Sequence, residues 1–385
     1  KKDIYWVGAI DWELRNFHGY LTQRGSTYNA YLIMDEKITL VDTVKPGALL
    51  TSQLLKRVSE IVDPAKIDYV ISNHTEMDHS GTLPEIMKIA KNAELVVSPN
   101  GEKGLKAHYK TDFNFKVVKS GDSLNLGKRT LQFYLTPMVH WPDNMINYIP
   151  EDKLLFTNDS FGQHYASAER FDDEAPFEIV MDEACKYYAN IVLPYGKQVR
   201  KELDAAKQLD FDMIAPSHGI IWRKHVKEIV DQYERWVSNE TQKKAVIVYD
   251  TMWRSTEYMA YAIMEAFEEA GYYPVMRNLQ HNHISDIMTD FQETEYLCVG
   301  SPTLNKNLMP NVAAFLTYLR GLSPGGRKAI AFGSFGWGGQ AIDQVEQYLK
   351  ECDLEVVHAH KQKYVPDNED YKALKEEVKK LVMGK

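Results

Sequence analysis

Short apolar runs followed by helical patterns organise the chain from Lys244 onward. After the first run, apolar residues recur at positions 259, 263, 264 and 267, the spacing of one face of a helix. The same order repeats as far as a last helical pattern, from Tyr371 toward Leu381. The predicted strands are residues 245–248, 274–279, 296–300, 328–332 and 354–358. Five short apolar strands that alternate with helices predict a parallel sheet covered on both faces.

The chain before residue 242 is less regular and predicts a mixed α/β sandwich. Helical patterns at residues 49–62 and 84–90 separate several of its strand-like runs. Those runs are residues 28–34, 38–41, 67–72, 94–98, 130–136, 154–157 and 211–215. The charged segment 238–244 is the predicted linker. We therefore expect two domains, at residues 1–242 and 243–385.

Composition and charge narrow the class of protein without naming a function. The 385 residues are 44% hydrophobic and 26% charged, which excludes disordered and low-complexity classes. Lys plus Arg number 45 against 54 Asp plus Glu, a net charge of -9, so we expect no nucleic-acid partner and no membrane partner. Three cysteines cannot form a disulfide framework or a four-thiolate metal site, and they indicate a reducing, cytoplasmic compartment.

A dense group of potential metal ligands follows the strand predicted at residues 67–72. The run NHTEMDHSG, residues 73–81, contains His74, Glu76, Asp78 and His79. A single His or Asp after a strand is more often a cap or a hydrogen-bonded loop residue. Four such residues so close together are hard to explain structurally, and they indicate a metal site.

Three further candidates each follow an apolar run. They are His140 in TPMVHWPDN, Asp159 in LLFTNDSFG and His218 in MIAPSHG. Loops at strand ends are where a rigid scaffold presents chemistry, so these residues can converge on one site. The full set has four imidazoles and three carboxylates, enough for two metals that share one carboxylate. Because the set has no thiolate, it favours iron or manganese over zinc.

Three loops of the C-terminal part contain residue types that are typical of a site for a phosphate and a flat aromatic ring. The loop TMWRSTE, residues 251–257, opens a helix with hydroxyl groups, which suits a phosphate monoester, although such hydroxyls are more often helix caps. It lacks GxGxxG, which disfavours NAD and FAD. The loops GSPTLNKN and GSFGWGG follow the third and fourth strands, where a doubly wound sheet binds its ligand. The candidate residues are Thr251, Met252, Trp253, Arg254, Ser255, Thr256, Ser301, Pro302, Thr303, Leu304, Asn305, Ser334, Phe335, Gly336, Trp337, Gly338 and Gly339.

Both motif sets resemble those of flavodiiron proteins and occur in that family's order. The HxExDH run resembles the di-iron form of the metallo-β-lactamase fold, with Glu76 in place of the second His of the zinc hydrolases' HxHxDH. The GSPTLN and SFGWGG stretches resemble the family's flavodoxin module. The resemblance covers essentially the whole chain. It implies an N-terminal metallo-β-lactamase-like αββα sandwich and a C-terminal flavodoxin-like, doubly wound, parallel five-stranded sheet, as in the minimal two-domain class.

The resemblance also implies the cofactors, FMN and two iron ions. Carried over by motif, one iron is held by His74, Glu76 and His140, the other by Asp78, His79 and His218, and Asp159 bridges them. Family members differ in whether the residue at His79 coordinates the metal. His18 in NFHGY and Tyr195 in LPYG are candidate catalytic residues that supply protons, and equally candidate packed residues with a satisfied polar tip.

The activity implied is that of a cytoplasmic flavodiiron oxidoreductase. FMN accepts electrons from an external donor and passes them to a di-iron centre that reduces O2 to water, NO to nitrous oxide, or both. The donor in the family is commonly rubredoxin and, in some archaeal members, a reduced deazaflavin. We expect a head-to-tail homodimer or a dimer of dimers, in which the flavin of one subunit serves the iron pair of the other.

Two other functions remain open at this point. One is a zinc-dependent hydrolase of the metallo-β-lactamase type fused to a flavodoxin-like module. The other is a flavin electron carrier with a structural metal site. The preference for O2 or NO, the electron donor and the choice of dimer or tetramer are not readable from the residues.

Overall fold

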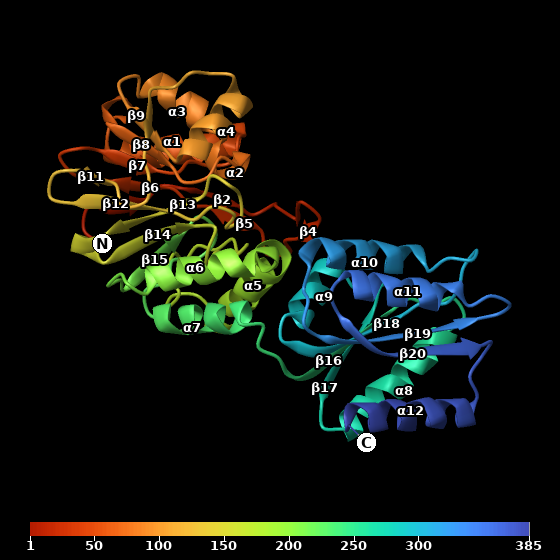
Figure 1. Ribbon diagram of the computed structural model, residues 1–385. Coiled ribbons are helices and arrows are strands. Elements are labelled where there is room, and N and C mark those ends of the chain that lie inside the picture. The colour runs from red at the N-terminus through yellow and green to blue at the C-terminus, as the bar shows by residue number, and fades with distance from the viewer. Residues whose placement is uncertain (385) are drawn as a thin grey trace. The chain divides into compact units, whose positions relative to one another are not determined.

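The computed structural model describes residues 1–384, which form two compact units (Figure 1). Unit 1 comprises Lys1–His18, Thr22–Tyr188 and Tyr195–Glu234. Unit 2 comprises Gly19–Leu21, Ala189–Pro194 and the chain from Arg235 onward. Two short segments of the N-terminal part therefore belong to unit 2, and the domain boundary between residues 242 and 243 stays a prediction.

Unit 1 contains two mixed sheets. The first is ordered β1 (Ile4–Trp6), β6 (Tyr31–Ile33), β7 (Thr39–Val41), β8 (Tyr69–Ser72), β9 (Glu94–Val97) and β10 (Phe115–Val117). The second is ordered β11 (Ser123–Asn125), β12 (Thr130–Leu135), β13 (Met145–Ile149), β14 (Leu154–Asn158) and β15 (Met213–Pro216). The remaining short strands of unit 1 are β2 (Ala9–Asp11), β3 (Asn16–Phe17) and β5 (Ser26–Tyr28), of which β2 pairs with β5. Strand β4 (Tyr20–Leu21) lies in a segment of unit 2.

The two sheets of unit 1 pack on each other between two layers of helices. In β9, Val96 belongs to the core between the sheets, whereas Leu95 and Val97 pack with helices on the outer face, as the period of two in a strand requires. The second sheet packs its outer face against Ala206. The helices are α1 (Ala48–Ile61), α2 (Met77–Ser80), α3 (Leu83–Ile89), α4 (Pro99–Tyr109), α5 (Phe177–Tyr187), α6 (Gly196–Ala206) and α7 (Val226–Val237). The predicted αββα sandwich is confirmed.

Unit 1 contains strands that the sequence analysis did not predict, among them β1, β10 and β11, and two further differences have a visible cause. The run 28–34, predicted as one strand, is divided between β5 and β6 at Asn29, whose side-chain amide donates to the carbonyl oxygens of Pro216 (2.8 Å) and Gly219 (3.0 Å). Strand β13 was not predicted, because the buried Asn147 interrupts its apolar pattern. Both differences arise from buried polar side chains, which a hydrophobicity pattern does not separate from loop residues.

Unit 2 is a sheet of five parallel strands with helices on both faces. Its order is β17 (Tyr273–Asn278), β16 (Gln242–Tyr249), β18 (Thr294–Gly300), β19 (Lys328–Phe335) and β20 (Glu355–Lys363). Helices α8 (Ser255–Glu269) and α12 (Asn368–Val382) cover one face, and α9 (Ile284–Phe291), α10 (Pro310–Leu322) and α11 (Gln340–Glu351) cover the other (Figure 1). The predicted doubly wound sheet is confirmed. Within residues 1–384, no helix combines the length and the apolar composition that crossing a bilayer requires.

Phe267 tests the packing of the α8 face of unit 2. Its ring is fully buried, with its centroid 5.1 Å from that of Tyr296 and 5.5 Å from that of Tyr272. Phe267→Ala should lower the free energy of unfolding by about 3–5 kcal/mol, since it removes apolar contacts and leaves a cavity. Urea unfolding followed by circular dichroism measures the loss. Phe267→Leu, which keeps most of the side-chain volume, should lower the free energy of unfolding clearly less. Equal losses for the two variants would contradict the packing argument.

Candidate metal centre and flavin loops

The seven predicted metal ligands of unit 1 lie on segments that follow four strands. His74 and Glu76 are in the loop after β8, and Asp78 and His79 are on the single turn of α2. His140 lies between β12 and β13, Asp159 directly follows β14, and His218 follows β15. Because the backbone N–H of Met145 donates to the carbonyl oxygen of Asn73 (3.1 Å), the two sheets meet at this edge of the sandwich.

The structure brings all seven side chains together in two groups. In each group, the possible ligand atoms lie within 4.8 Å of one another. The first ligand group is His74, Glu76, His140 and Asp159, and the second ligand group is Asp78, His79 and His218. All are buried except His140, which is partly buried.

Glu76 connects the two histidines of the first ligand group. Its Oε2 lies 3.2 Å from His74 Nε2 and 3.4 Å from His140 Nε2. One carboxylate oxygen and two imidazole nitrogens therefore point to a common centre. Oxygen and imidazole ligands of this kind suit a divalent transition metal.

The second ligand group contains buried polar atoms that lack hydrogen bonds. Asp78 Oδ2 lies 3.4 Å from His79 Nε2 and 3.2 Å from His218 Nε2. Among the described residues, neither carboxylate oxygen of Asp78 and neither ring nitrogen of His79 makes a hydrogen bond of acceptable geometry. Burying such groups unsatisfied is costly, and a cation between them removes that cost. The group therefore fits a metal ion.

Asp159 divides its two oxygens between the two ligand groups. Its Oδ2 lies 3.2 Å from His140 Nε2 and 3.8 Å from His74 Nε2. Its Oδ1 lies 2.9 Å from His79 Nε2 and 3.6 Å from His218 Nε2. A carboxylate in this position can bind one metal through each oxygen, so the geometry fits a bridged pair of ions.

The electrostatics of the two groups favour a cation. Burial alone lowers the pKa of a histidine, yet the surrounding carboxylates outweigh it and raise the pKa of His74 to about 10 and those of His79 and His140 to about 9. Burial raises the pKa of Asp159, but the imidazoles around it hold that pKa well below its usual range. The carboxylates thus hold protons on these rings, and metal binding replaces those protons.

Two further contacts orient the imidazoles. His74 Nδ1 lies 3.3 Å from Asp143 Oδ2, an oxygen that also accepts the backbone N–H of Thr75 at 2.6 Å. His218 Nδ1 donates to the carbonyl oxygen of Thr27 at 2.7 Å. These partners leave Nε2 of both rings facing the site, as in other metal centres. Sequence analysis missed Asp143, although it lies three residues after His140 in the HWPDN run, and no sequence signal marks the Thr27 carbonyl.

The two candidate proton donors both lie beside the first ligand group. His18 Nε2 is 2.9 Å from Glu76 Oε1, and its side chain is 72% exposed. The ring centroid of Tyr195 lies 6.3 Å from that of His140. A third ring that sequence analysis missed, His164, is buried with its centroid 4.8 Å from that of His218.

The three predicted flavin loops lie together at the carboxyl edge of the sheet in unit 2. Thr256 Oγ1 lies 3.3 Å from Ser334 Oγ, and the backbone N–H of Thr303 donates to the carbonyl oxygen of Ser334 at 3.0 Å. A Cβ at Gly333 would lie only 1.9 Å from the carbonyl oxygen of Ser301, so this approach of two loops requires glycine. The loops after β16, β18 and β19 therefore form one surface.

This surface presents a buried hydroxyl and two exposed indoles. Thr251 Oγ1 is buried and has no hydrogen-bond partner within residues 1–384, and the residue that precedes α8, Arg254, makes no side-chain cap to the helix. The Thr251 hydroxyl and the uncapped backbone N–H groups at the start of α8 can therefore donate hydrogen bonds to a phosphate. Trp253 and Trp337 are 88% and 95% exposed, which leaves their rings open to a flat ligand. These residues fit FMN.

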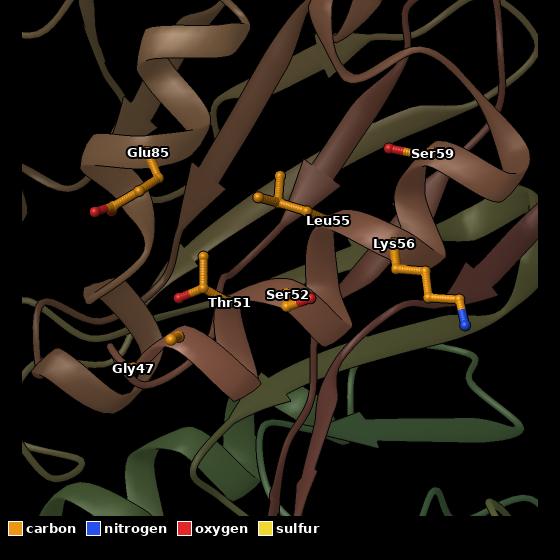
Figure 2. A pocket seen from close by; sticks show the side chains of 8 residues that line it. Gly47, Thr51, Ser52, Leu55, Lys56, Ser59 and Glu85 are labelled. Atoms are coloured by element: carbon orange, nitrogen blue, oxygen red, sulfur yellow. The ribbon is translucent and has the colours of Figure 1, made fainter.

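Asp250 holds the first of these loops in place, and sequence analysis missed it. Its carboxylate accepts from the Gln280 side chain at 2.7 Å and from the Asn311 side chain at 3.0 Å. In unit 1, a separate hollow beside α1 contains none of the predicted site residues (Figure 2). Its lining is Gly47, Ala48, Thr51, Ser52, Leu55, Lys56, Ser59 and Glu85.

Comparisons with known proteins agree with this description. The sequence family described as ODP family beta lactamase matches residues 27–219, and the flavodoxin family matches residues 247–377. A nitric oxide reductase of Moorella thermoacetica is 45% identical over 359 residues, which cover 92% of this chain and 90% of that protein. A rubredoxin-oxygen oxidoreductase of Megalodesulfovibrio gigas is 40% identical over 376 residues, which cover 96% and 93%. The crystal structure of the flavodiiron protein from Giardia intestinalis, 35% identical, matches with a TM-score of 0.95 over 100% of this chain and 96% of that one.

Fold and site together define a protein with a metallo-β-lactamase-like domain, at one edge of which two groups of metal-binding side chains meet, followed by a flavodoxin-like domain. The predicted fold class is confirmed. The chain belongs to the flavodiiron protein family.

Asp159→Asn tests the bridging position. The substitution keeps the shape of the side chain and removes the negative charge that both ligand groups share. We expect the iron content of each chain to fall while the FMN content stays unchanged, as measured by metal analysis and flavin absorbance. Asp112→Asn, at an exposed carboxylate, is the matched control. Full iron occupancy in Asp159→Asn would show that the bridging assignment is wrong.

Asp143→Asn tests the orientation of His74. Removing the charge behind the imidazole should weaken metal binding by roughly 10–100-fold, the range for outer partners of metal ligands. Competition with a chelator of known affinity measures the change. The Asp112→Asn control should retain the affinity of the unmodified chain, and equal affinities for all three proteins would exclude a role for Asp143.

Proposed function

We propose that this chain is an oxidoreductase that reduces O2 to water, NO to nitrous oxide, or both, with electrons that pass through FMN to a non-haem di-iron centre. The observation that carries the proposal is the position of Asp159, whose two oxygens face two separate groups of imidazoles. The flavin loops of unit 2 support it, because a hydrolase has no use for an FMN-binding module. When bound, FMN stores two electrons and releases them singly, and the iron pair binds and polarises a diatomic substrate.

The seven side chains of the two ligand groups are the proposed iron ligands. His74, Glu76 and His140 hold one ion. Asp78, His79 and His218 hold the other, and Asp159 joins them. We include His79 because its Nε2 faces both Asp78 and Asp159 from within the second group.

The flavin loops divide the binding of FMN between them. The hydroxyls of Thr251, Ser255 and Thr256 and the first backbone N–H groups of α8 take the phosphate. The loops after β18 and β19, residues 301–305 and 334–339, line the isoalloxazine ring together with Trp253. The exposed indoles then lose contact with water when the ring is in place.

His18 and Tyr195 are the proposed proton-supplying residues. Reduction of O2 to water consumes four protons, and reduction of two NO to nitrous oxide and water consumes two. The exposed ring of His18 is in contact with water on one side and with Glu76 on the other, so it can pass a proton toward the first ligand group. Tyr195 presents its phenol beside His140.

The proposal extends to the electron donor and the assembly. We propose that FMN receives its electrons from a rubredoxin-type donor, because the two units have three cysteines, too few for the four thiolates of a rubredoxin centre. Rubredoxin is the first choice, because one relative is named for its oxidation, and a reduced deazaflavin is the second. A head-to-tail homodimer or a dimer of dimers in the cytoplasm completes the proposal.

Steady-state turnover tests the proposed function. Iron-loaded, FMN-bound protein is mixed anaerobically with reduced rubredoxin and then with O2 or NO at limiting concentration. We expect catalytic consumption of at least one gas with excess donor, and the ratio of the two rates shows the preferred substrate. Reduced deazaflavin replaces rubredoxin in a parallel series.

The two other functions give different results in the same preparation. A zinc hydrolase would contain zinc and no flavin and would turn over esters or thioesters. An electron carrier would show slow reoxidation of its flavin and no turnover with excess donor. Either result would contradict the proposed reductase.

A further inference from the structure

A third group of potential metal ligands lies in unit 2, outside the flavin loops. His358 and His360 are on β20, and Glu377 is on α12. Because side chains alternate along a strand, His358 and His360 point to the same face of the sheet. That face is the one covered by α8 and α12, so both imidazoles are directed toward the helix that carries Glu377.

The three side chains converge on a common point. Glu377 Oε2 lies 3.6 Å from His358 Nε2 and 3.7 Å from His360 Nδ1. The possible ligand atoms of all three residues lie within 4.8 Å of one another. Two ligands of a tetrahedral zinc ion are separated by about 3.3–3.5 Å, given bond lengths of about 2.0–2.2 Å. The two N···O separations between Glu377 and the histidines exceed this ligand–ligand distance by only a few tenths of an ångström.

Ordinary ion pairs do not account for this arrangement. Both N···O separations are too long for hydrogen bonds, and His358 Nε2 is shielded from water and has no hydrogen-bond partner in the described part of the chain. Lys375 and Lys379, each two residues from Glu377, pair with other carboxylates: Lys375 with Glu265 and Glu269, and Lys379 with Glu269. Glu377 instead faces the two imidazoles.

The chemistry of the group selects a class of ion. Two imidazoles and one carboxylate are the ligand set of several zinc and ferrous sites, whereas magnesium and calcium prefer oxygen ligands alone. The histidine side chains are 18% and 22% exposed, and that of Glu377 is 54% exposed. The group is thus enclosed on the protein side and open to water on the other, which gives an entry path and room for water as a fourth ligand.

We propose that His358, His360 and Glu377 form a peripheral site for a divalent transition-metal ion, with zinc as the representative ion. Bound there, the metal joins the edge strand β20 to α12. It shares no ligand with the two groups of unit 1, so the proposal stands independently of the di-iron centre.

Zinc binding to the complete protein tests this site. Iron-loaded, FMN-bound chain is dialysed against about 10 µM free zinc, and zinc, iron and flavin are measured for each chain. We expect one zinc ion more in the unmodified protein than in the double variant His358→Ala/His360→Ala, with equal iron and FMN. His281→Ala, at an exposed histidine of the same unit, is the matched control and should bind as much zinc as the unmodified chain.

Glu377→Gln provides a second variant, in which the side chains of strand β20 are left unchanged. Its side chain is mostly exposed, so the substitution leaves the fold intact while it removes the charged ligand. Zinc affinity at this site should fall at least about tenfold. The proposal is overturned if the iron-loaded, unmodified chain takes up no zinc. It is also overturned if both variants bind as much zinc as the unmodified chain.

Discussion

The contact between Asp159 and the four imidazoles at the edge of the sandwich is the interaction on which the function of unit 1 depends. It places a carboxylate, buried and negatively charged, between two groups that also contain Glu76 and Asp78. Without cations, protons on the imidazoles balance this charge. Four strand ends from two sheets must meet for the arrangement to exist, so the sandwich is the scaffold that keeps like charges together.

Much of this architecture is predictable from local patterns, and several of the exceptions involve buried polar side chains. Alternating strands and helices predict the flavodoxin-like sheet, since each element buries a regular apolar face. The metal ligands are predictable because ligands must be specific residue types at strand ends. Asn29, Asn147 and Asp143 escaped prediction. All three are buried polar residues, and the partners of Asn29 and Asp143 are remote in sequence, so only the folded chain shows how those two are satisfied.

The two cofactor sites differ in how far they are exposed to water. The metal centre is enclosed, and its imidazoles are oriented by partners such as Asp143 and the Thr27 carbonyl. The flavin surface is open, with two indoles almost fully exposed and one hydroxyl, that of Thr251, buried. A closed site excludes water from reactive chemistry, whereas an open flavin surface keeps the ring within reach of a protein donor.

The brevity of α2 has a consequence for how metal is retained. Asp78 and His79 are adjacent on a helix of four residues, so one helical turn supplies two ligands of the second group. The residue that follows this helix, Gly81, packs so tightly that an added Cβ would lie 2.2 Å from Pro46 Cδ. Because these two ligands share one turn, a change that displaces the turn moves both of them together. The second ligand group thus depends on one short turn for two of its three side chains, whereas the first draws its four side chains from segments that follow three strands.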